Sequence, residues 1–276
     1  MQQLNIKILS SASFGYIIDE KSVAKKGLKS IGVSRQYCGS TGKIDNCQTG
    51  VYSVLTTPGI TLPCNFRLFL PKPWLKGQQE IKTKVDLAME MIKQDRKNGI
   101  LPQWYGGDAL YGRAVKMTSF IEDECGANFV MDTTKNQLIN LKDPSDKRRK
   151  SITVEKYLRQ IDISKEKIVR YEEAKKARVH IAAVIIKDKN QKENSRHRRL
   201  VISKGLSKNH KIKLSLTNFT LQEKKAAQLV YMQRARFNVE QYFREASQVA
   251  GMADYQVRGQ MGWQHVQILS MLIMQL

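Results

Sequence analysis

The sequence predicts an α/β fold in which a mixed sheet is flanked by helices. Residues 14–19 form an apolar, strand-like run that ends in Asp19, and residues 103–108 form a second, aromatic run that ends in Asp108. Between these runs, residues 82–98 have the apolar spacing of an amphipathic helix. Strand-like runs that alternate with helical periodicity are typical of an α/β core.

Further strands are expected after the first acidic run. Apolar side chains recur at near-alternate spacing in residues 30–37 and again in residues 49–56. The turn-rich segment 39–46 between them suits a hairpin connection. Residues 62–70 are predicted to supply a third antiparallel strand, which Pro71 closes.

The helix over residues 82–98 has one apolar face and ends at Gly99. The apolar side chains that share this face are Val85, Ala88, Met89 and Ile92. After the second acidic run, residues 112–125 predict another helix. Three strands, a helix, a strand and a helix follow one another in a ribonuclease H-like core, and this is the core that we expect.

Residues 132–229 break the pattern and are predicted to form an insertion that contains β-strands. A helix is expected over residues 151–177. Three β-like runs follow, at residues 179–186, 199–203 and 212–216. The chain is then expected to return to the core as a helix over residues 221–249, which carries Glu240.

The predicted organisation therefore has three parts. Residues 1–131 form the first part of the core, residues 132–229 form the insertion, and residues 230–276 form the C-terminal helical part. Positive charge is concentrated in the insertion, because Leu141 to Leu229 contains 25 basic and 10 acidic residues, a net of +15. Such a concentration favours a surface that binds phosphate.

The whole chain is strongly basic, with 47 Lys and Arg residues against 25 Asp and Glu residues and a net charge of +22. A polyanion is therefore the expected partner. Charge alone leaves open a ribosome-associated protein, or a basic protein whose charge serves only solubility. At 276 residues with 41% hydrophobic content, the chain is long enough for one large or two modest domains.

No secretory signal is recognisable near the N-terminus, and the late apolar run at residues 266–276 is too short and too interrupted for a membrane span. We expect a cytoplasmic, nucleoid-associated protein with no membrane partner. The four cysteines show no C-x-x-C spacing and lie far from the histidines, so reduced structural thiols are expected. They are Cys38, Cys47, Cys64 and Cys125.

Three acids in this order suit a two-metal phosphoryl-transfer site. Asp19, Asp108 and Glu240 can converge on two divalent ions, which stabilise the attacking and the leaving oxygen of an in-line transfer. Alternatives remain open at each position. Asp19 by itself could be a turn or capping residue, Glu20 is a rival ligand that alternation points to the opposite face, and Glu245 is a rival of Glu240.

Several motifs resemble the bacterial insertion-sequence transposases of the DDE superfamily, a family of endonucleases. The similar segments are residues 18–27, 30–39, 42–48, 67–71 and 107–112, Tyr255-Gln256-Val257-Arg258 and Gly262-Trp263. They span nearly the whole chain and are sparsest in residues 132–229. The combination is specific, whereas any one of the motifs alone would be weak.

The resemblance implies a ribonuclease H-like fold with Asp19, Asp108 and Glu240 as catalytic residues and metal ligands. It also implies two Mg²⁺ or Mn²⁺ ions as cofactors. Double-stranded DNA, both element ends and target, is the implied partner, and a homodimer on DNA is a further expectation. The implied reaction is cleavage of a phosphodiester at an element end, followed by joining of the freed 3′-hydroxyl to target DNA.

The sequence departs from the family's pattern around the third acid. Where the family has Trp, Ile, Glu, Phe and Lys, this chain has, in order, Phe237, Val239, Glu240, Phe243 and Ser247. The replaced lysine would hold phosphate, and Arg236 and Arg244 are candidates to compensate. Fewer than twenty residues precede Asp19, where relatives carry a helical region, so a truncated copy that lacks the family's N-terminal region is expected.

Basic residues near the acids are the candidate DNA contacts. They are Lys25, Lys26, Arg35, Lys43, Arg113, Arg236, Arg244 and Arg258. The basic runs 147–150 and 196–199 are predicted to be loops that grip the DNA backbone without sequence preference.

Two functions other than transposition remain open. One is a stand-alone ribonuclease H-like nuclease that cuts DNA without joining it. The other is a catalytically inactive DNA-binding remnant, which Ser247 and the short N-terminus would favour.

Overall fold

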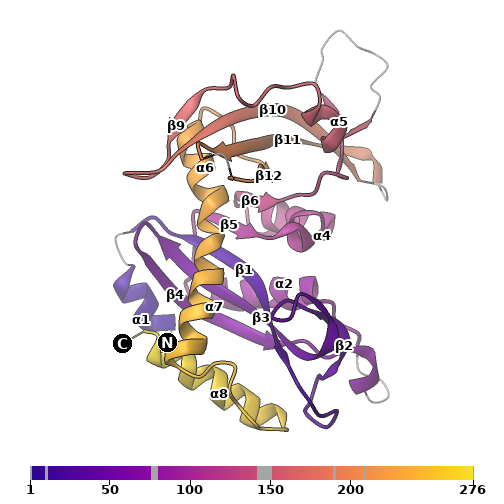
Figure 1. Ribbon diagram of the computed structural model, residues 1–276, viewed down its shortest axis with the longest axis vertical. Helices are drawn as coiled ribbons and strands as arrows, with labels where there is room; N and C mark the ends of the chain where they lie inside the picture. Colours follow the sequence, from indigo (N-terminus) through magenta and orange to yellow (C-terminus); the bar gives the residue numbers. More distant parts are fainter. Residues whose placement is uncertain are drawn as a thin grey trace. The chain divides into compact units, whose positions relative to one another are not determined.

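The computed structural model describes residues 2–9, 12–75, 80–141, 151–188, 191–207 and 209–275. The chain divides into two compact units (Figure 1). Unit 1 combines Met1–Gln103 with Phe237–Leu276, and unit 2 is Trp104–Arg236. Each unit is a sheet with helices packed on it, so the predicted mixed α/β class is confirmed.

Unit 1 is built around one long central strand, β3 (Lys43–Thr57). Strand β1 (Gly15–Ala24) pairs antiparallel with one edge of β3. Strands β2 (Ser34–Cys38) and β4 (Ile60–Leu68) pair antiparallel with successive stretches of its other edge. The predicted hairpin and the predicted third antiparallel strand are therefore both present. From Cys47 to Thr57 every residue of β3 is buried, which is expected of a strand covered on both faces.

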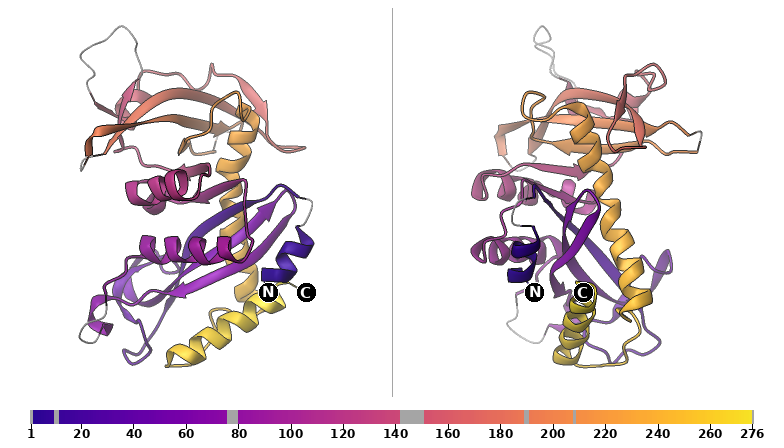
Figure 2. Two further views of the ribbon diagram at one scale, coloured as in Figure 1. Left: turned by 180° about the vertical axis from the view of Figure 1, so that it is seen from behind. Right: turned by 90° about the vertical axis from the view of Figure 1, so that its left-hand side faces the viewer.

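Two helices cover opposite faces of the unit 1 sheet (Figures 1 and 2). Helix α2 (Lys84–Lys97) packs on β3 and β4, and helix α7 (Phe237–Val249) packs on β1, β3 and β4. The helix predicted over residues 82–98 is confirmed. Thr83 caps its N-terminus by accepting a hydrogen bond from the backbone N–H of Asp86, and Gly99, with φ +87°, allows the chain to leave the helix.

The remaining helices of unit 1 lie at its two chain ends and before α2. They are α1 (Gln2–Ile8), the short 3₁₀ helix η1 (Lys72–Trp74) and α8 (Gln260–Ile273). Helix α8 buries Trp263 and Gln267, and the Gln267 side chain accepts a hydrogen bond from the Tyr52 hydroxyl at 2.8 Å. The C-terminal helix is thereby anchored to the central strand β3.

A fully buried carboxylate joins four elements of unit 1. Asp95 of α2 accepts hydrogen bonds from Tyr16 of β1 at 2.6 Å, from Asn65 of β4 at 2.6 Å and from Gln2 of α1 at 2.5 Å. Burial raises the pKa of the Asp95 carboxyl, whereas these donors and the Cys64 thiol lower it. Every partner is a donor, which suits an ionised carboxylate because it can only accept hydrogen bonds.

Unit 2 contains a mixed sheet with the strand order β5-β6-β12-β11-β10-β7-β8. Strand β9 lies off this path and pairs with β10. Strands β5 (Trp104–Gly107) and β6 (Phe129–Asp132) are parallel. The crossover between them contains α3 (Ala109–Gly112), α4 (Val115–Ser119) and a π-helical turn, η2 (Phe120–Glu124). A parallel pair requires such a crossover, so β5, the crossover and β6 form a β-α-β unit.

The other strands of unit 2 pair antiparallel. They are β7 (Leu138–Leu141), β8 (Ile152–Thr153), β9 (Ile168–Arg170), β10 (Lys176–Asp188), β11 (Gln191–Gly205) and β12 (Lys213–Thr217). The β-like runs predicted at residues 179–186 and 199–203 lie within β10 and β11, and the run predicted at residues 212–216 overlaps β12. A distinct insertion and a ribonuclease H-like core remain predictions.

Three predicted helices differ from those observed. The helix expected over residues 151–177 is α5 (Val154–Leu158) alone, and β9 follows it. Asp162 explains part of this, because its side chain accepts a hydrogen bond from the Ser164 backbone N–H at 3.0 Å and so favours a turn. The helix expected over 221–249 is α6 (Ala226–Ala235) and α7, separated at Arg236. The helix expected over 112–125 is divided between α3, α4 and η2.

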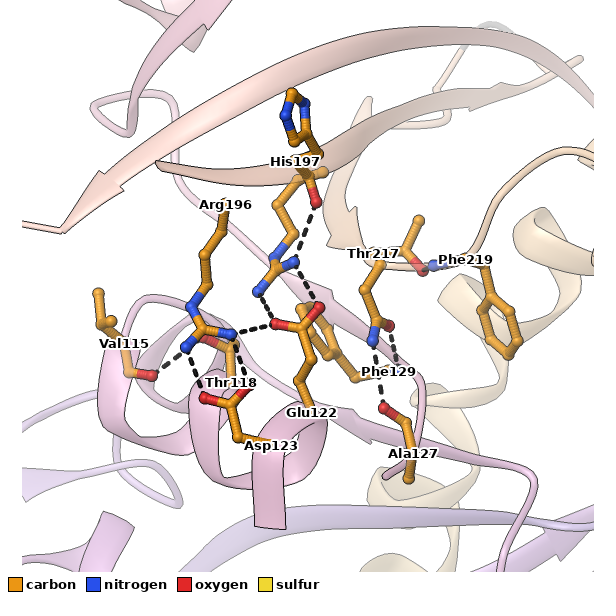
Figure 3. Close-up of polar contacts among 12 residues, drawn as sticks. Val115, Thr118, Glu122, Asp123, Ala127, Phe129, Arg196, His197, Thr217 and Phe219 are labelled. Carbon is orange, nitrogen blue, oxygen red and sulfur yellow. Dashed lines mark hydrogen bonds and ion pairs between the residues drawn. The ribbon is translucent and has the colours of Figure 1, made fainter. Parts of the chain in front are cut away.

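An ion-pair cluster ties η2 to β11 (Figure 3). Arg198 donates to both carboxylate oxygens of Glu122, at 3.0 and 2.6 Å. Arg196 donates to Asp123 at 2.5 and 2.9 Å and also pairs with Glu122. Burial raises the pKa of the Glu122 carboxyl, but Arg198 and Arg196 more than offset this and hold that pKa below its usual range.

This cluster corrects one prediction about the basic runs. Residues 196–199 are part of strand β11 rather than a loop, and the Arg198 side chain is only 4% exposed. Arg196 and Arg198 therefore stabilise unit 2 through Glu122 and Asp123 instead of offering exposed charge. The other basic run, residues 147–150, lies outside the described residues.

We predict that Glu122→Gln destabilises the protein by about 2 to 4 kcal/mol, because removing one partner leaves the buried Arg198 charge uncompensated. Asp123→Asn is the matched control. The Asp123 side chain is 53% exposed, so its loss should cost about 1 kcal/mol or less. Urea denaturation of both variants at neutral pH measures the difference.

The loss of stability caused by Glu122→Gln should also depend on pH. Because the folded-state pKa of Glu122 is lowered, its stabilisation is present above the unfolded-state pKa and is lost as the pH falls through the folded-state pKa. The gap between wild type and Glu122→Gln should therefore shrink in acid. Equal costs for the two variants at neutral pH would contradict a role for Glu122 as the main partner of Arg198.

Candidate functional site

Asp19 lies within β1, at the point where the strand becomes partly exposed. Residues Gly15–Ile18 are buried, and the strand continues beyond Asp19 to Ala24. Asp19 is thus not at the end of the strand, as the sequence suggested, but it does end the buried run. One Asp19 oxygen accepts a hydrogen bond from the Glu20 backbone N–H at 2.9 Å.

The two faces of β1 point to different helices. Tyr16 bonds to Asp95 of α2, and Glu20 pairs with Lys84 of α2 at 2.9 Å. Lys21, in contrast, donates to the backbone oxygen of Phe243 on α7 at 3.3 Å. Because alternate residues of a strand share a face, Asp19 lies with Lys21 on the face that α7 covers.

Glu20 is therefore held by a cation of its own. Its side chain is 15% exposed, and the Lys84 ammonium partly neutralises it. One oxygen of Glu20 and one of Asp19 come within 4.8 Å of each other, a spacing that a shared ion allows. Face and counter-charge together favour Asp19 over Glu20 as the primary ligand, which is the choice that the sequence motif indicated.

Glu240 lies in the first turn of α7 and is half-buried. Two contacts of α7 lie on either side of it: Asn238 donates to Thr56 at 2.8 Å, and Lys21 reaches the Phe243 backbone oxygen. Thr56 pairs with Gly15 of β1, so these contacts also lie on either side of Asp19 along the strand. Among the described residues, Glu240 does not join Asp19 and Glu20 in a carboxylate group within 4.8 Å.

Asp108 directly follows β5 in unit 2 and caps helix α3. Its side chain accepts a hydrogen bond from the Leu110 backbone N–H at 2.8 Å. Steric crowding explains why this motif has glycine at positions 107 and 112. A Cβ at Gly112 would lie 2.1 Å from the Asp132 backbone oxygen, and one at Gly107 would lie 3.1 Å from the Tyr111 Cβ. The capping role considered for Asp19 is therefore observed at Asp108.

The predicted DNA contacts divide into two groups. Lys25 and Arg236 have internal partners: Lys25 donates to the Tyr255 backbone oxygen at 2.9 Å and lies 3.6 Å from the centre of its ring, and Arg236 pairs with Asp132 at 2.8 Å. Burial lowers the pKa of the Lys25 ammonium. The exposed group consists of Lys26, Arg35, Lys43, Arg113, Arg244 and Arg258.

Sequence reasoning missed a chain of hydrogen bonds inside unit 1 that connects Gln48, Tyr255 and Trp263, three residues of the motifs shared with the transposases. Tyr255 donates to Gln48 of β3 at 2.6 Å, and the Trp263 indole donates to the Tyr255 hydroxyl at 3.2 Å. Burial raises the pKa of Tyr255 to about 12. These residues connect the chain after α7 to the central strand. Their occurrence in the motifs shared with the transposases was the available signal. Lys21, in the segment 18–27, carried the same signal, whereas Lys84 lies outside these motifs.

Ser247, at the position where the related motif has a lysine, serves the helix itself. Its hydroxyl donates to the Phe243 backbone oxygen at 2.6 Å. Arg244, one of the two suggested replacements for the lysine, is exposed, whereas Arg236 pairs with Asp132. Of the two, Arg244 is thus the exposed cation.

The donor set fits a hard divalent cation. Carboxylate oxygens are the ligands that Mg²⁺ and Mn²⁺ prefer, and a few of them suffice beside water and a phosphate oxygen. Fold and side chains together define an α/β protein that presents carboxylates on and just after strands. In the described part of the chain, none of the helices is long and apolar enough to cross a membrane.

Residues 1–151 match the family described as DDE superfamily endonuclease. The match covers more than half of the chain, so the protein belongs to this family. The matched segment includes Asp19 and Asp108 and ends before Glu240. Family membership therefore covers the two aspartates and leaves the position of the third acid to the physical argument.

Two individual proteins are also similar. The chain is 30% identical over 141 residues to a probable transposase for insertion sequence element IS701 from Microchaete diplosiphon. That match covers 50% of this chain and 37% of the relative, so it spans little more than a third of the relative's length. The NurA nuclease from Sulfolobus solfataricus aligns over 82% of this chain and 73% of its own, with 12% identity and a TM-score of 0.36, too low to support a fold assignment.

We predict that Asp19→Asn and Glu20→Gln have opposite effects. Asp19→Asn keeps an oxygen for the Glu20 N–H and should fold normally, but it should weaken Mn²⁺ binding by at least about tenfold because a charged ligand is lost. Glu20→Gln should retain most of the binding and lose about 1 kcal/mol of stability with its Lys84 partner. Calorimetric Mn²⁺ titration and urea denaturation measure the two effects. The reverse pattern would make Glu20 the ligand.

Proposed function

We propose that this chain is the catalytic part of a DNA transposase, which cleaves phosphodiesters at insertion-sequence ends and joins the freed 3′-hydroxyl to target DNA. Family membership over residues 1–151 is the observation that carries this proposal, because the matched segment contains both Asp19 and Asp108. The similarity to the probable IS701 transposase supports the same class of reaction.

We further propose that Asp19 and Asp108 serve the same metal ions. Each aspartate directly follows a buried run of a strand, Gly15–Ile18 of β1 and Trp104–Gly107 of β5. Both aspartates also fall in the segment that matches the family, which supports assigning them one shared function.

In this proposal Glu240 is the third ligand. It lies on α7, which covers the face of β1 to which Asp19 is assigned. Two bound Mg²⁺ or Mn²⁺ ions would supply charge stabilisation for the attacking and leaving oxygens. The residues' own part is to hold oxygen ligands on two strands and one helix. Like charges repel, so Lys84 contributes by partly neutralising Glu20, which would otherwise add a further negative charge beside Asp19.

The proposed substrate is double-stranded DNA, both at the element ends and at the target. The net charge of +22 supports this, and the exposed cations Lys26, Arg35, Lys43, Arg113, Arg244 and Arg258 are the proposed phosphate contacts. Lys25 and Arg236 are proposed to act indirectly, by holding the elements around the site. Residues 132–229 as a basic lobe, a homodimer on DNA and association with the nucleoid belong to the same proposal.

A catalytically inactive DNA-binding remnant is the second candidate. Ser247 favours it, because the hydroxyl that replaces the family's lysine bonds within its own helix and brings no charge to a phosphate. A nuclease that cuts without joining differs from the leading proposal only in its products.

The central test compares metal-dependent activities of active-site variants. Wild type should nick supercoiled DNA with Mn²⁺ and transfer a pre-cleaved element end. Asp108→Asn and Glu240→Gln should each reduce both activities by more than about a hundredfold, because each removes a charged metal ligand. Asn can still cap α3, so Asp108→Asn should remain folded. Glu245→Gln, a change of an exposed acid on the same helix, is the matched control and should leave both activities unchanged.

The products separate the candidates. Nicking without strand transfer would favour the stand-alone nuclease. DNA binding without any metal-dependent cleavage would favour the remnant. A loss of activity with Glu245→Gln but not with Glu240→Gln would reassign the third ligand.

DNA affinity gives an independent prediction. Arg35→Gln and Arg258→Gln should weaken binding similarly on unrelated sequences, and each should reduce the slope of log affinity against log salt by about one, because a phosphate contact is lost. Lys97→Gln, which changes an exposed cation at the end of α2, is the control and should have little effect. Salt-insensitive binding by the wild type would contradict the proposed phosphate contacts.

A further inference from the structure

The β2–β3 hairpin, whose strands are labelled in Figure 1, exposes apolar side chains on one of its faces. In the register of the two strands, Arg35 lies opposite Asn46, and Tyr37 lies opposite Ile44. Opposite residues share a face of a hairpin, and so do alternate residues of one strand. These four residues therefore form one face, which we call the Tyr37 face. On it, Tyr37 is 65% exposed and Ile44 is 61% exposed.

The opposite face of the hairpin is partly buried and contains its acid. Cys38 and Cys47 lie on that face and are fully buried. Asp45 lies there as well, 3.8 Å from the Lys43 ammonium. It is the only acidic residue between positions 34 and 47 of the sequence. The Tyr37 face therefore has no carboxylate of its own, and its one ionised side chain is the Arg35 guanidinium.

Further cations are attached to the hairpin beside this face. The Asn46 side chain donates hydrogen bonds to the backbone oxygens of Lys25 at 2.7 Å and of Gly27 at 3.0 Å. It thereby holds the loop after β1 against the hairpin. Lys26 and Lys29 of this loop are exposed. Cations thus adjoin the exposed aromatic ring on more than one side chain, which favours an anionic ligand.

The packing of unit 1 makes little use of Tyr37. Among the described residues, neither its hydroxyl nor the Arg35 guanidinium has a hydrogen-bond or ion-pair partner. The hydroxyls of the buried Tyr52 and Tyr255, in contrast, donate to Gln267 and to Gln48. The Tyr37 ring and the neighbouring guanidinium are therefore available to a ligand.

An exposed aromatic ring beside cations suits an unpaired nucleotide. Proteins that bind single-stranded DNA stack its bases on aromatic rings and hold its phosphates with Lys and Arg. A base inside a duplex is already stacked on both of its faces and must leave the stack before a side chain can cover it. A duplex would therefore use the cations alone, whereas an unpaired nucleotide would use ring and cations together.

We propose that the Tyr37 face binds an unpaired nucleotide of DNA. The base stacks on the Tyr37 ring beside Ile44, and the adjoining phosphates are held by Arg35 and by Lys26 and Lys29 of the neighbouring loop. This inference rests on the proposed function and names the part of the DNA substrate that this face recognises, namely unpaired nucleotides at or beside an element end.

The test measures the affinity of the intact protein for a fluorescein-labelled oligothymidylate of about twelve nucleotides, in EDTA so that no metal-dependent cleavage occurs. The matched probe is an abasic strand of the same length, which has the same phosphates but no bases. Wild type should bind oligothymidylate at least about fivefold more tightly than the abasic strand, because a stacked base adds that much or more. Tyr37→Ala should remove this preference, and Tyr37→Trp should retain it. Equal binding of the two strands by the wild type, or an undiminished preference in Tyr37→Ala, would overturn the proposal.

Two further variants separate stacking from charge. Arg35→Gln should weaken binding of oligothymidylate, of the abasic strand and of a relaxed circular duplex alike, because it removes a phosphate contact. Tyr37→Ala should leave the duplex affinity unchanged. Leu101→Ala, which changes another exposed apolar side chain of unit 1, is the control and should alter none of the three affinities. An equal loss on all three probes with Tyr37→Ala would overturn the stacking role.

Photochemical crosslinking of the wild type locates the contact directly. An oligonucleotide in which iododeoxyuridine replaces thymidine should, under ultraviolet light, form an adduct that mass spectrometry maps to Tyr37. Adducts confined to other residues would overturn the proposal.

The result can be told apart from that of the transposase proposal because binding is measured without metal ions. Loss of the base preference in a protein that still nicks DNA with Mn²⁺ would overturn this inference alone. A base preference that Tyr37→Ala abolishes, in a protein that cuts no DNA, would support this inference while the transposase proposal fails.

Discussion

The antiparallel pairing of β1 with β3 is the interaction on which the rest of unit 1 depends. Its register runs without interruption from Gly15 opposite Thr56 to Ala24 opposite Cys47. A slip of one residue would exchange the two faces of β1. Asp19 would then move toward α2 and the Lys84 side, and Tyr16 would leave Asp95. The register therefore fixes both the candidate ligand and the buried hydrogen-bond centre.

Both units use polar groups in the core to fix which elements meet. In unit 1, Asp95 has partners from α1, β1 and β4, and Gln48 connects β3 to Tyr255. In unit 2, Glu122 connects η2 to β11. A buried polar group is stable only when its partners are present, so each network penalises alternative packings. Apolar contacts alone would not discriminate so strongly between neighbouring registers.

Much of the fold could be predicted because its signals are local. The β2–β3 hairpin follows from its turn residues, and α2 follows from its apolar period, Thr83 and Gly99. The failures arose where distant residues decide the outcome. Arg196 and Arg198 looked like exposed charge because Glu122 and Asp123 lie more than 70 residues away in sequence. The helix expected over 151–177 was wrong because strand pairing of residues 168–170 with β10 outweighs helical propensity.

The candidate site, like the fold, could be predicted from the sequence only where its signals are local. Asp19 and Asp108 stood out because each follows an apolar run, and both fall in the segment that matches the family. Glu20 could be separated from Asp19 only through Lys84, whose pairing depends on how α2 packs.

Net charge overstates the surface that can bind a polyanion. Lys21, Lys25 and Lys84 bond to backbone oxygens or a carboxylate inside unit 1. Arg196, Arg198 and Arg236 do the same with carboxylates inside unit 2. Cations with such partners cannot turn to a phosphate without breaking a native contact, whereas Arg35 and Arg258 are exposed. The number of phosphates that the protein neutralises is therefore set by exposure and partners, and it should be well below the formal excess of basic residues.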